Sequence, residues 1–506
     1  MLNTLLIDAC PRPDEARHPE DVLHRPEGAD GHHPLVVDLD GTLVKADLLH
    51  ESLTVALLKQ PRSCHRIFAW LAKGRAHLKA RLAEAVTLDP ATLPYRADLL
   101  GWLKQEKAKG RRIVLATAAN HRIASTVADH LGLFDEVVSS DENVNLKSAA
   151  KRDALVGRYG LGGFAYVGNA RADLPVWQAA SRAHVAGHAP QLTGLLRDRG
   201  RLGKVFDEPT SMLSALLQAM RPAQWAKNLL ILVPLLMAHL LFELGPLATA
   251  LLATVVFSLA ASGVYILNDL VDLQDDRHHP RKRLRPFASG ALPVAIGWVC
   301  WPALLLMAAA ASLAMLPAAF TGWLAAYLAL TLAYSLWLKR KPIVDVVTLA
   351  LLYTVRLIAG AAAIAVPLSF WLLSFSIFVF LSLALVKRYS ELRTALVDEK
   401  PGQLRGRGYG PSDLNFVAIL GGSAGYTSVL VLALYIQDPR TASLYASTEL
   451  IWPACPIFLF WISRFWLLAC RGEIKDDPVV FAVQDRTSWL IAAMLACTFA
   501  LASWIK

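Results

Sequence analysis

The chain has 506 residues, more than a single hydrophobic core usually supports, so two or more domains are expected. It is 55% apolar with a mean hydropathy of +0.40, yet its N-terminal part carries charge at the density of a soluble protein, whereas the remainder alternates long apolar runs with short charged loops. The net charge of +10 does not indicate nucleic-acid binding, because the basic residues of the second half cluster in loops beside apolar segments, where anionic lipids and phosphate substrates are met.

The N-terminus is rich in proline, histidine and acidic residues and contains no apolar stretch like the core of a signal peptide. We predict a disordered tail over residues 1–30, which starts in the cytoplasm. A soluble domain is expected over 31–205 and an integral membrane domain over 206–506.

The soluble part has the pattern of an α/β domain. Short apolar strands are predicted at 34–38, 112–116 and 164–168, each followed by polar turn residues and a helical stretch. This alternation predicts a parallel, doubly wound sheet whose ligands lie at the carboxyl ends of the strands. Residues 45–100 are mostly helical in pattern and interrupt the sheet after its first strand, so they are expected to form a small cap.

Two carboxylates, Asp38 and Asp40, follow the first strand in the motif Asp-Leu-Asp-Gly-Thr. Acids two residues apart allow one to attack phosphorus while the other protonates the leaving oxygen. The motif resembles the first motif of haloacid-dehalogenase-like (HAD) phosphatases. That resemblance implies that Asp38 is the nucleophile and Asp40 the general acid and base. It also implies that Thr117 binds the phosphoryl group and that a lysine, Lys151 or alternatively Lys147, neutralises its charge.

The resemblance further implies a Mg²⁺ site formed by Asp38, Asp40, Asn169 and Asp173. Asn169 stands where many HAD phosphatases have an acid. A neutral amide still ligates through oxygen but holds Mg²⁺ less strongly. Two readings of the domain therefore remain open, an active phosphatase and a catalytically inert regulatory or assembly module.

The second half is predicted to be an all-α bundle of nine transmembrane helices, because it contains nine apolar segments close to the roughly 20 residues that a bilayer requires. Lys and Arg concentrate in the loops after the second, fourth, sixth and eighth segments, which places those loops and the N-terminus inside and the C-terminus outside. The segments lie near 226–244, 246–267, 292–313, 318–338, 343–365, 368–387, 413–436, 449–470 and 487–505.

The second apolar segment ends in an acidic array. Asp269, Asp272 and Asp276 follow Asn268 at spacings of three and four residues, so they are expected on one helix face, where they suit Mg²⁺ bridging to a diphosphate. Acids near bilayer depth cost roughly 2.5 to 3.5 kcal/mol each at a helix centre, which favours a functional role. The pattern resembles the first acidic motif of UbiA-type transferases. The basic residues Arg277, Lys282 and Arg285 follow in the next loop and are candidates to cradle substrate phosphates.

The usual second acidic motif of UbiA-type enzymes is not apparent. Tyr334 and Lys339 precede a single acid, Asp345, and Arg356 follows inside the apolar segment. Together with the runs 221–228, 356–360 and 387–391, this departure resembles the decaprenyl-phosphate phosphoribosyltransferase branch of the family. The resemblance implies transfer of 5-phosphoribose from phosphoribosyl pyrophosphate to a polyprenyl phosphate, with Mg²⁺ on the donor.

The acceptor is already an anion, so it needs cations to position it and no base to activate it. Arg356 is the strongest candidate, since apolar residues flank it on both sides. The full set of substrate-binding candidates outside the acidic loop is Lys227, Asn268, Tyr334, Lys339, Arg356, Lys387, Arg388 and Tyr389.

The two halves together predict a two-step enzyme of a bacterial inner (cytoplasmic) membrane, with both sites on the cytoplasmic side. The transferase would make polyprenyl-phosphoryl 5-phosphoribose, and the HAD-like domain would remove the 5-phosphate. An aromatic prenyltransferase that uses a polyprenyl diphosphate is the alternative within membrane enzymes.

Overall fold

The computed structural model describes residues 33–59, 64–142, 144–207, 211–397, 408–438, 445–474 and 477–504; the predicted tail over residues 1–30 lies outside them. The chain divides into two compact units. The first unit is Met1–Leu216 with Asp269–Gly297, and the second is Leu217–Asn268 with Trp298–Lys506. The first unit thus includes residues 269–297, which contain the acidic array that was predicted as part of the membrane domain.

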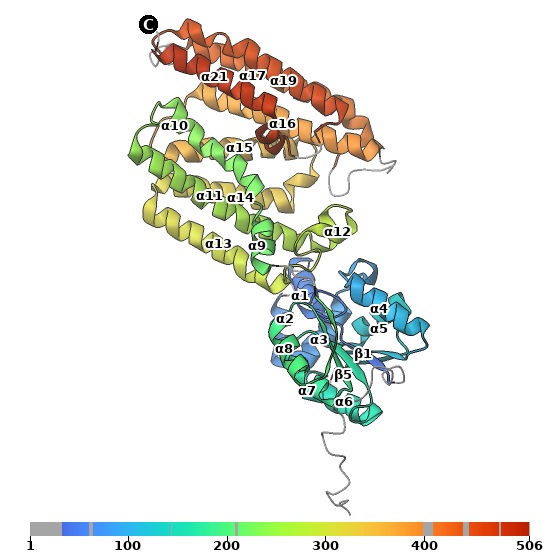
Figure 1. Ribbon diagram of the computed structural model, residues 1–506. Helices are drawn as coiled ribbons and strands as arrows, with labels where there is room; N and C mark the ends of the chain where they lie inside the picture. Colours follow the sequence, from blue (N-terminus) through green and yellow to red (C-terminus); the bar gives the residue numbers. More distant parts are fainter. Residues whose placement is uncertain are drawn as a thin grey trace, which may run out of the picture. The chain divides into compact units, whose positions relative to one another are not determined.

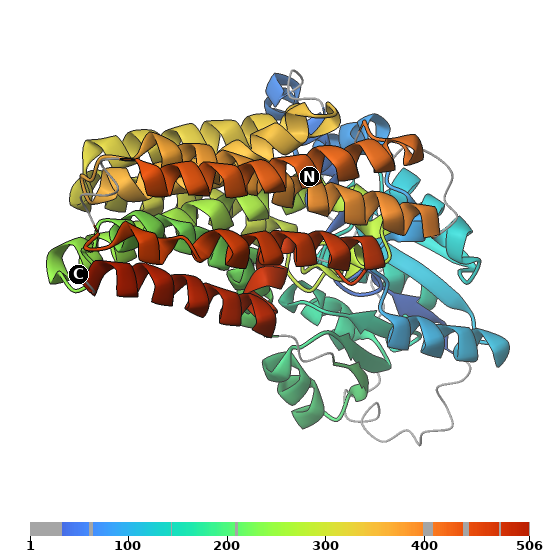
Figure 2. The same ribbon diagram turned by 90° about the horizontal axis from the view of Figure 1, so that it is seen from above.

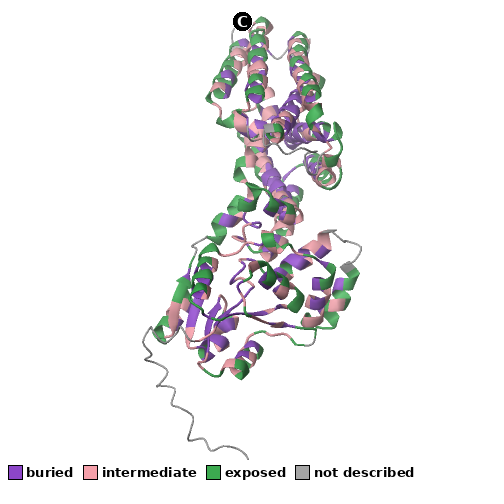
Figure 3. Cartoon of the chain, turned by 90° about the vertical axis from the view of Figure 1, so that its right-hand side faces the viewer, coloured by how far each residue is buried: buried purple, intermediate pink, exposed green. Residues whose placement is uncertain are grey.

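A six-stranded parallel sheet forms the centre of the first unit (Figure 1). Its strand order is β3-β2-β1-β4-β5-β6, so β1 lies in the middle with β2 and β4 on either side. All three residues of β1 are fully buried, with Leu35 and Val37 in one core and Val36 in the other, as expected for a strand covered on both faces (Figure 3). The predicted parallel sheet is confirmed. The strands are β1 Leu35–Val37, β2 Ile113–Asn120, β3 Glu136–Ser140, β4 Ala165–Gly168, β5 Arg182–Ala186 and β6 Leu202–Phe206.

Helices cover the sheet and build a cap between β1 and β2. The cap helices α1 Leu48–Lys59, α2 Cys64–Ala72 and α3 Arg75–Ala85 have an apolar core of their own. The remaining helices of this unit are α4 Ala97–Ala108, α5 His121–Leu131, α6 Ala149–Tyr159, α7 Leu174–Ala179, α8 Pro190–Asp198 and α12 Leu273–His278, with the short turns η5 Pro90–Thr92, η6 Arg171–Asp173 and η8 Lys282–Leu284.

Eight helices among the described residues are long and apolar enough to cross a membrane. The prediction of a ninth, over 226–244, is not confirmed: this stretch contains η7 Pro222–Leu232 and the five-residue α10 Val233–Met237. Pro234, near the start of α10, cannot donate the backbone hydrogen bond that would continue a helix across this stretch. The eight are α11 Leu244–Val271, α13 Val294–Met315, α14 Ala318–Leu336, α15 Val344–Ala363, α16 Phe370–Val397, α17 Leu414–Gln437, α19 Ala454–Arg471 and α21 Arg486–Trp504; α9 Met212–Met220 and α20 Pro478–Gln484 are shorter.

The long helices of the second unit run alongside one another (Figure 2), and α15 contacts several other elements of this unit. It packs against both α14 and α16. Its most apolar stretch is 72% buried within the protein, against 17% for α13 and α21. Polar side chains on α15 therefore face other protein groups, whereas the outer helices present apolar surface.

Candidate active sites

The first site lies at the carboxyl ends of the central strands. Asp38 follows β1, and its Oδ1 accepts a hydrogen bond from the Lys151 Nζ at 2.7 Å. Both side chains are buried, and burial raises the pKa of Asp38 while the charge of Lys151 opposes that rise. Lys151 is in the first turn of α6, whereas the alternative Lys147 is exposed. Thr117, fully buried on β2, accepts a hydrogen bond from the Ala119 N–H at 2.9 Å.

Asp173, the last residue of the turn η6 that follows β4, lies beside this pair. Its Oδ2 accepts hydrogen bonds from the Asn169 and Ala170 N–H groups, both at 3.1 Å, and its Oδ1 lies 3.9 Å from the Lys151 Nζ. The Tyr166 hydroxyl donates to Asp173 at 2.8 Å and accepts from Lys151 at 3.0 Å. Tyr166 was missed from the sequence, because only the folded sheet brings its hydroxyl to the strand ends.

Asp40 is tied to the cap. Its Oδ1 accepts a hydrogen bond at 2.9 Å from the N–H of Leu48, the first residue of α1. Burial, helped by the negative charge of Asp47, raises the pKa of Asp40 to about 7. A carboxyl that is partly protonated near neutral pH suits a general acid. Lys79 of α3, also missed from the sequence, donates to the Ala118 carbonyl at 2.6 Å beside the same strand ends.

Asn169 lies against the Asp-Leu-Asp-Gly-Thr motif. Gly41 has φ +73°, and a Cβ added there would come within 2.2 Å of the Asn169 amide nitrogen, so only glycine fits. The oxygens of Asp38, Asp173 and Asn169 are the ligand type that Mg²⁺ prefers. No group of three or more His, Cys, Asp or Glu side chains that could hold a metal occurs among the described residues, so an ion here would need the amide or backbone oxygens as well.

The second site is the acidic array, which also belongs to the first unit. The array does not lie on one continuous helix as expected, because α11 ends at Val271 and Asp272 caps the start of α12. Arg285 nevertheless brings two of the acids together, with its Nη1 3.2 Å from Asp269 Oδ1 and 2.6 Å from Asp276 Oδ2. Both carboxylates are buried.

Arg285 contacts only one of the two carboxylate oxygens of Asp276, Oδ2, so the other oxygen could contact a second cation. Its buried Oδ1 accepts no hydrogen bond from the described residues, and the Lys282 Nζ lies 3.8 Å away. Burial raises the pKa of Asp276, and the charge of Arg285 opposes that rise. A buried carboxylate oxygen without a hydrogen bond is suited to a metal ion. Arg277, predicted beside these acids as a phosphate ligand, instead pairs with Glu51 of α1.

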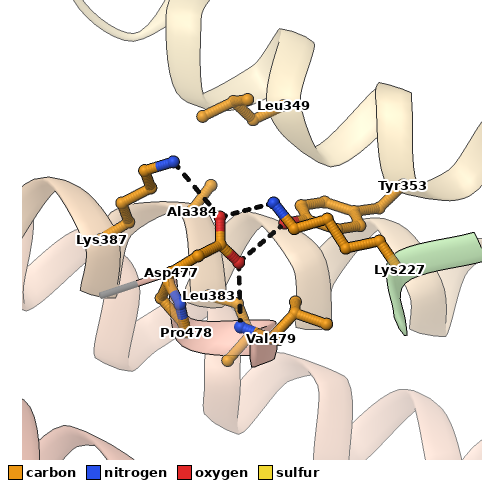
Figure 4. A pocket seen from close by; sticks show the side chains of 9 residues that line it. All are labelled: Lys227, Leu349, Tyr353, Leu383, Ala384, Lys387, Asp477, Pro478 and Val479. Atoms are coloured by element: carbon orange, nitrogen blue, oxygen red, sulfur yellow. Dashed lines mark hydrogen bonds and ion pairs between the residues drawn. The ribbon is translucent and has the colours of Figure 1, made fainter. Parts of the chain in front are cut away.

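Two predicted acceptor-binding lysines meet in the second unit (Figure 4). Asp477 Oδ2 lies 2.6 Å from the Lys227 Nζ and 3.2 Å from the Lys387 Nζ, and the Tyr353 hydroxyl lies 3.4 Å from the other oxygen. These side chains line a cavity of about 30 Å³, which is room for a water molecule rather than a phosphate group. Asp477, which caps α20, was missed from the sequence, because an acid in a short loop carries no local signal.

Arg356 lies next to the cavity lining, with its guanidinium carbon 5.5 Å from the ring centroid of Tyr353. Its Nε donates to Asn228 Oδ1 at 3.0 Å and its Nη2 to the Tyr327 hydroxyl at 3.1 Å, and Nη1 donates to the Leu352 carbonyl. The Tyr327 ring centroid lies 4.8 Å from the guanidinium carbon. All three nitrogens of the guanidinium therefore have protein partners, and Arg356 is not among the residues that line the cavity.

The single acid in place of a second acidic motif is also paired internally. Asp345 Oδ2 lies 2.8 Å from Arg388 Nη2, and both side chains are fully buried. The Tyr409 hydroxyl donates to Asp345 Oδ1 at 2.8 Å. Arg388 also pairs with Glu391.

The remaining candidates are more dispersed. Tyr389 packs edge-on against Trp466 with ring centroids 5.9 Å apart. Tyr334 is half-buried against the core around α14, Lys339 is half-buried in η9 Leu338–Arg340, and Asn268 is half-buried on α11.

Comparison with known proteins gives the family. The model of the UbiA prenyltransferase family matches residues 229–399. An uncharacterized protein of Sinorhizobium fredii, y4nM, is 37% identical over 471 residues, which is 93% of this chain and 91% of the relative. The nodulation protein NoeC of Azorhizobium caulinodans is 38% identical over 56% of this chain and 90% of its own length. The decaprenyl-phosphate phosphoribosyltransferase of Mycolicibacterium smegmatis is 32% identical over 55% of this chain and 89% of its own length.

The match to y4nM leaves 9% or less of either chain uncovered, so it extends across both halves. The matched UbiA region begins at residue 229, after the parallel sheet ends at Phe206, so the α/β part and the transferase part are separate in the sequence. The chain belongs to the UbiA prenyltransferase family and has a parallel α/β domain ahead of its multi-pass transferase part.

Proposed function

We propose that the transferase part moves 5-phosphoribose from phosphoribosyl pyrophosphate to a polyprenyl phosphate, and that the HAD-like domain then removes the 5-phosphate to leave polyprenyl-phosphoryl ribose. The relatives named decaprenyl-phosphate phosphoribosyltransferase support the first step. The observation that carries the choice of substrate is the buried Asp345–Arg388 pair. A polyprenyl diphosphate would need a second acidic site, and the one acid at that place is already neutralised.

The donor is assigned to Asp269, Asp272 and Asp276. Mg²⁺ bound there would neutralise the diphosphate and so make it a better leaving group. An acceptor phosphate oxygen forms a bond to ribose C1, and the bond from C1 to the diphosphate oxygen breaks with its electron pair leaving on diphosphate. Arg285 holds Asp269 and Asp276 close together and adds positive charge beside them.

The acceptor phosphate is assigned to Lys227 and Lys387. Their ammonium groups already share one anion, the Asp477 carboxylate. Because the cavity beside them is too small for a phosphate group, we infer that the acceptor phosphate takes the place of this carboxylate. Arg356, held by Asn228 and Tyr327, then supports the helix packing around the site rather than binding the acceptor.

The phosphatase step is assigned to the site at the strand ends. An Asp38 oxygen attacks the 5-phosphate phosphorus, and the ribose O5′ leaves with a proton from Asp40. Water then attacks the aspartyl phosphate, gives its proton to Asp40 and releases inorganic phosphate. Lys151 and Thr117 bind the phosphoryl oxygens, and Mg²⁺ held by Asp38, Asp173 and Asn169 would offset their charge. The intact contacts among Asp38, Lys151 and Asp173 favour this reading over an inert module.

We further propose that the chain lies in the cytoplasmic membrane of a bacterium, with its N-terminus and both sites inside and its C-terminus outside. The concentration of Lys and Arg in alternate loops supports this orientation.

The test uses purified full-length protein with labelled phosphoribosyl pyrophosphate, polyprenyl phosphate and Mg²⁺, followed by separation of the lipid-linked products. Wild-type protein should form lipid-linked ribose and release inorganic phosphate. Asp38→Asn should form a lipid product that keeps its 5-phosphate, whereas Asp129→Asn, a change of the same kind at an exposed site on α5, should behave as wild type. A wild-type product that keeps its 5-phosphate would refute the second step, and absence of any lipid product would refute the first.

A further inference from the structure

A buried ion pair joins the phosphatase cap to the loop that follows the acidic array. Glu51, in the first turn of α1, has a side chain only 1% exposed, and that of Arg277, in the last turn of α12, is 3% exposed. Arg277 Nη1 donates to Glu51 Oε2 at 2.7 Å, and Nη2 donates to the other carboxylate oxygen. Each charge is buried, so each depends on the other for compensation.

The third hydrogen bond of Arg277 closes the loop. Its Nε donates to the Ala288 carbonyl at 3.1 Å, which ties the end of α12 to a residue eleven positions later. Arg285, which contacts both Asp269 and Asp276, lies between these two points. The guanidinium of Arg277 therefore does two things: it pairs with Glu51, and it fixes the conformation of the loop that brings Arg285 to Asp269 and Asp276.

Two further contacts join the same segments. Gly290 has φ +75°, and a Cβ there would come within 2.7 Å of the Lys45 Cβ and 3.3 Å of Pro94, so its backbone packs closely on the cap. The His278 Nε2 lies 3.3 Å from Asp89 Oδ2 at the surface. Three contacts from separate residues thus hold the loop on residues 45–94.

We propose that Glu51 is a positioning residue for the transferase: through Arg277 it holds the loop that places Arg285 at the acidic array, so the phosphatase cap is a structural part of the donor site. This role rests on the proposed function, because it assigns the donor diphosphate to Asp269, Asp272 and Asp276. It predicts that a change in the cap alters the use of phosphoribosyl pyrophosphate without touching the phosphatase machinery.

The experiment measures two activities of the full-length protein in vesicles, transfer from phosphoribosyl pyrophosphate and hydrolysis of p-nitrophenyl phosphate. Glu51→Gln should raise the KM for phosphoribosyl pyrophosphate at least tenfold and leave the KM for polyprenyl phosphate within twofold. Its hydrolysis of p-nitrophenyl phosphate should stay within threefold of wild type, which shows that the domain remains folded. Glu84→Gln is the matched control, because Glu84 lies on α3 of the same cap and pairs with Arg81 at the surface.

A second variant pair keeps the test decisive if Glu51→Gln folds poorly. Arg277→Gln should impair donor use as Glu51→Gln does, and the double variant Glu51→Gln/Arg277→Gln should fold at least as well as either single variant because no unpaired charge remains buried. Its donor KM should still exceed that of wild type. Wild-type donor KM in the folded double variant, or equal losses for donor and acceptor, would overturn the positioning role. If wild-type protein makes no lipid-linked product, the proposed function fails instead.

Discussion

Replacing Lys227 by Met tests whether the paired lysines bind the acceptor phosphate. The Lys227 side chain is 12% exposed, and its partner Asp477 is 8% exposed, so a phosphate in this place would receive a largely desolvated, charge-assisted hydrogen bond. Such bonds contribute about 1.5 to 3 kcal/mol. Since 1.4 kcal/mol corresponds to a factor of ten, Lys227→Met should raise the KM for polyprenyl phosphate by roughly 10- to 150-fold.

The assay is initial-rate transfer in vesicles, with each substrate varied in turn. Lys227→Met should leave the KM for phosphoribosyl pyrophosphate within about threefold of wild type. Lys341→Met is the control, because Lys341 is exposed in a basic loop of the same unit.

Lys227→Met also leaves the Asp477 carboxylate with Lys387 as its remaining lysine partner, so the same assay includes Asp477→Asn and the double variant. Asp477→Asn removes a competing anion and should lower the acceptor KM. The double variant should bind the acceptor less well than Asp477→Asn alone. An unchanged acceptor KM in both Lys227 variants would refute the assignment of this cavity to the acceptor phosphate.

Three further changes test other parts of the structure. Asp272→Asn should reduce transfer at least a hundredfold while hydrolysis of p-nitrophenyl phosphate persists; full transfer would contradict the donor assignment. Arg356→Ala should lower the thermal midpoint of the protein in detergent, since it removes the hydrogen bonds from Arg356 to Asn228 Oδ1 and to the Tyr327 hydroxyl; selective loss of acceptor affinity at unchanged stability would instead make Arg356 an acceptor ligand. Burial, with nearby Arg111, lowers the pKa of His184 to about 3, and the His184 Nδ1 must stay unprotonated to accept the Lys204 N–H at 2.8 Å. The folded state therefore binds fewer protons than the unfolded state, so the heat resistance of the phosphatase activity should fall between pH 7 and pH 5, and His184→Gln should flatten that dependence.

The sheet could be predicted because buried parallel strands have short, continuous apolar sequences. In this chain the first such run is followed by Asp38 and Asp40. The same local signal marked Asp38, whereas Asp173 and Lys151 were proposed from the resemblance to HAD phosphatases, and only the buried position of Lys151 on α6 separates it from the exposed Lys147. Tyr166 could not be predicted, since its contact with Asp173 depends on the folded strand ends.

The membrane part shows where composition alone was insufficient. The stretch over 226–244 is apolar enough for a span, but it divides into the end of η7 and the short α10, with Pro234 near the start of α10. Because Arg277 lies in a basic loop, the sequence predicts that it binds phosphate. In the structure it pairs instead with Glu51, which is 226 residues away in the sequence. Asp477 likewise becomes informative only when α16 and α20 bring Lys387 beside it. Pairings between residues so far apart produce no periodic pattern in the sequence, so they could not be predicted from it.

The carboxylate of Asp477 balances the charge of Lys227 and Lys387, and this affects which phosphates could bind to these lysines. A pair of bare lysines would attract any soluble phosphate, but here the positive charge is already balanced by a group tethered to the protein. A ligand must outcompete that tethered anion, which is present at a high effective concentration. A phosphate anchored in the bilayer is also confined near the site, whereas free phosphate is dilute by comparison. Under the proposed assignment of the acceptor phosphate to Lys227 and Lys387, the internal counter-ion would favour membrane-bound acceptors over the phosphates of bulk solution.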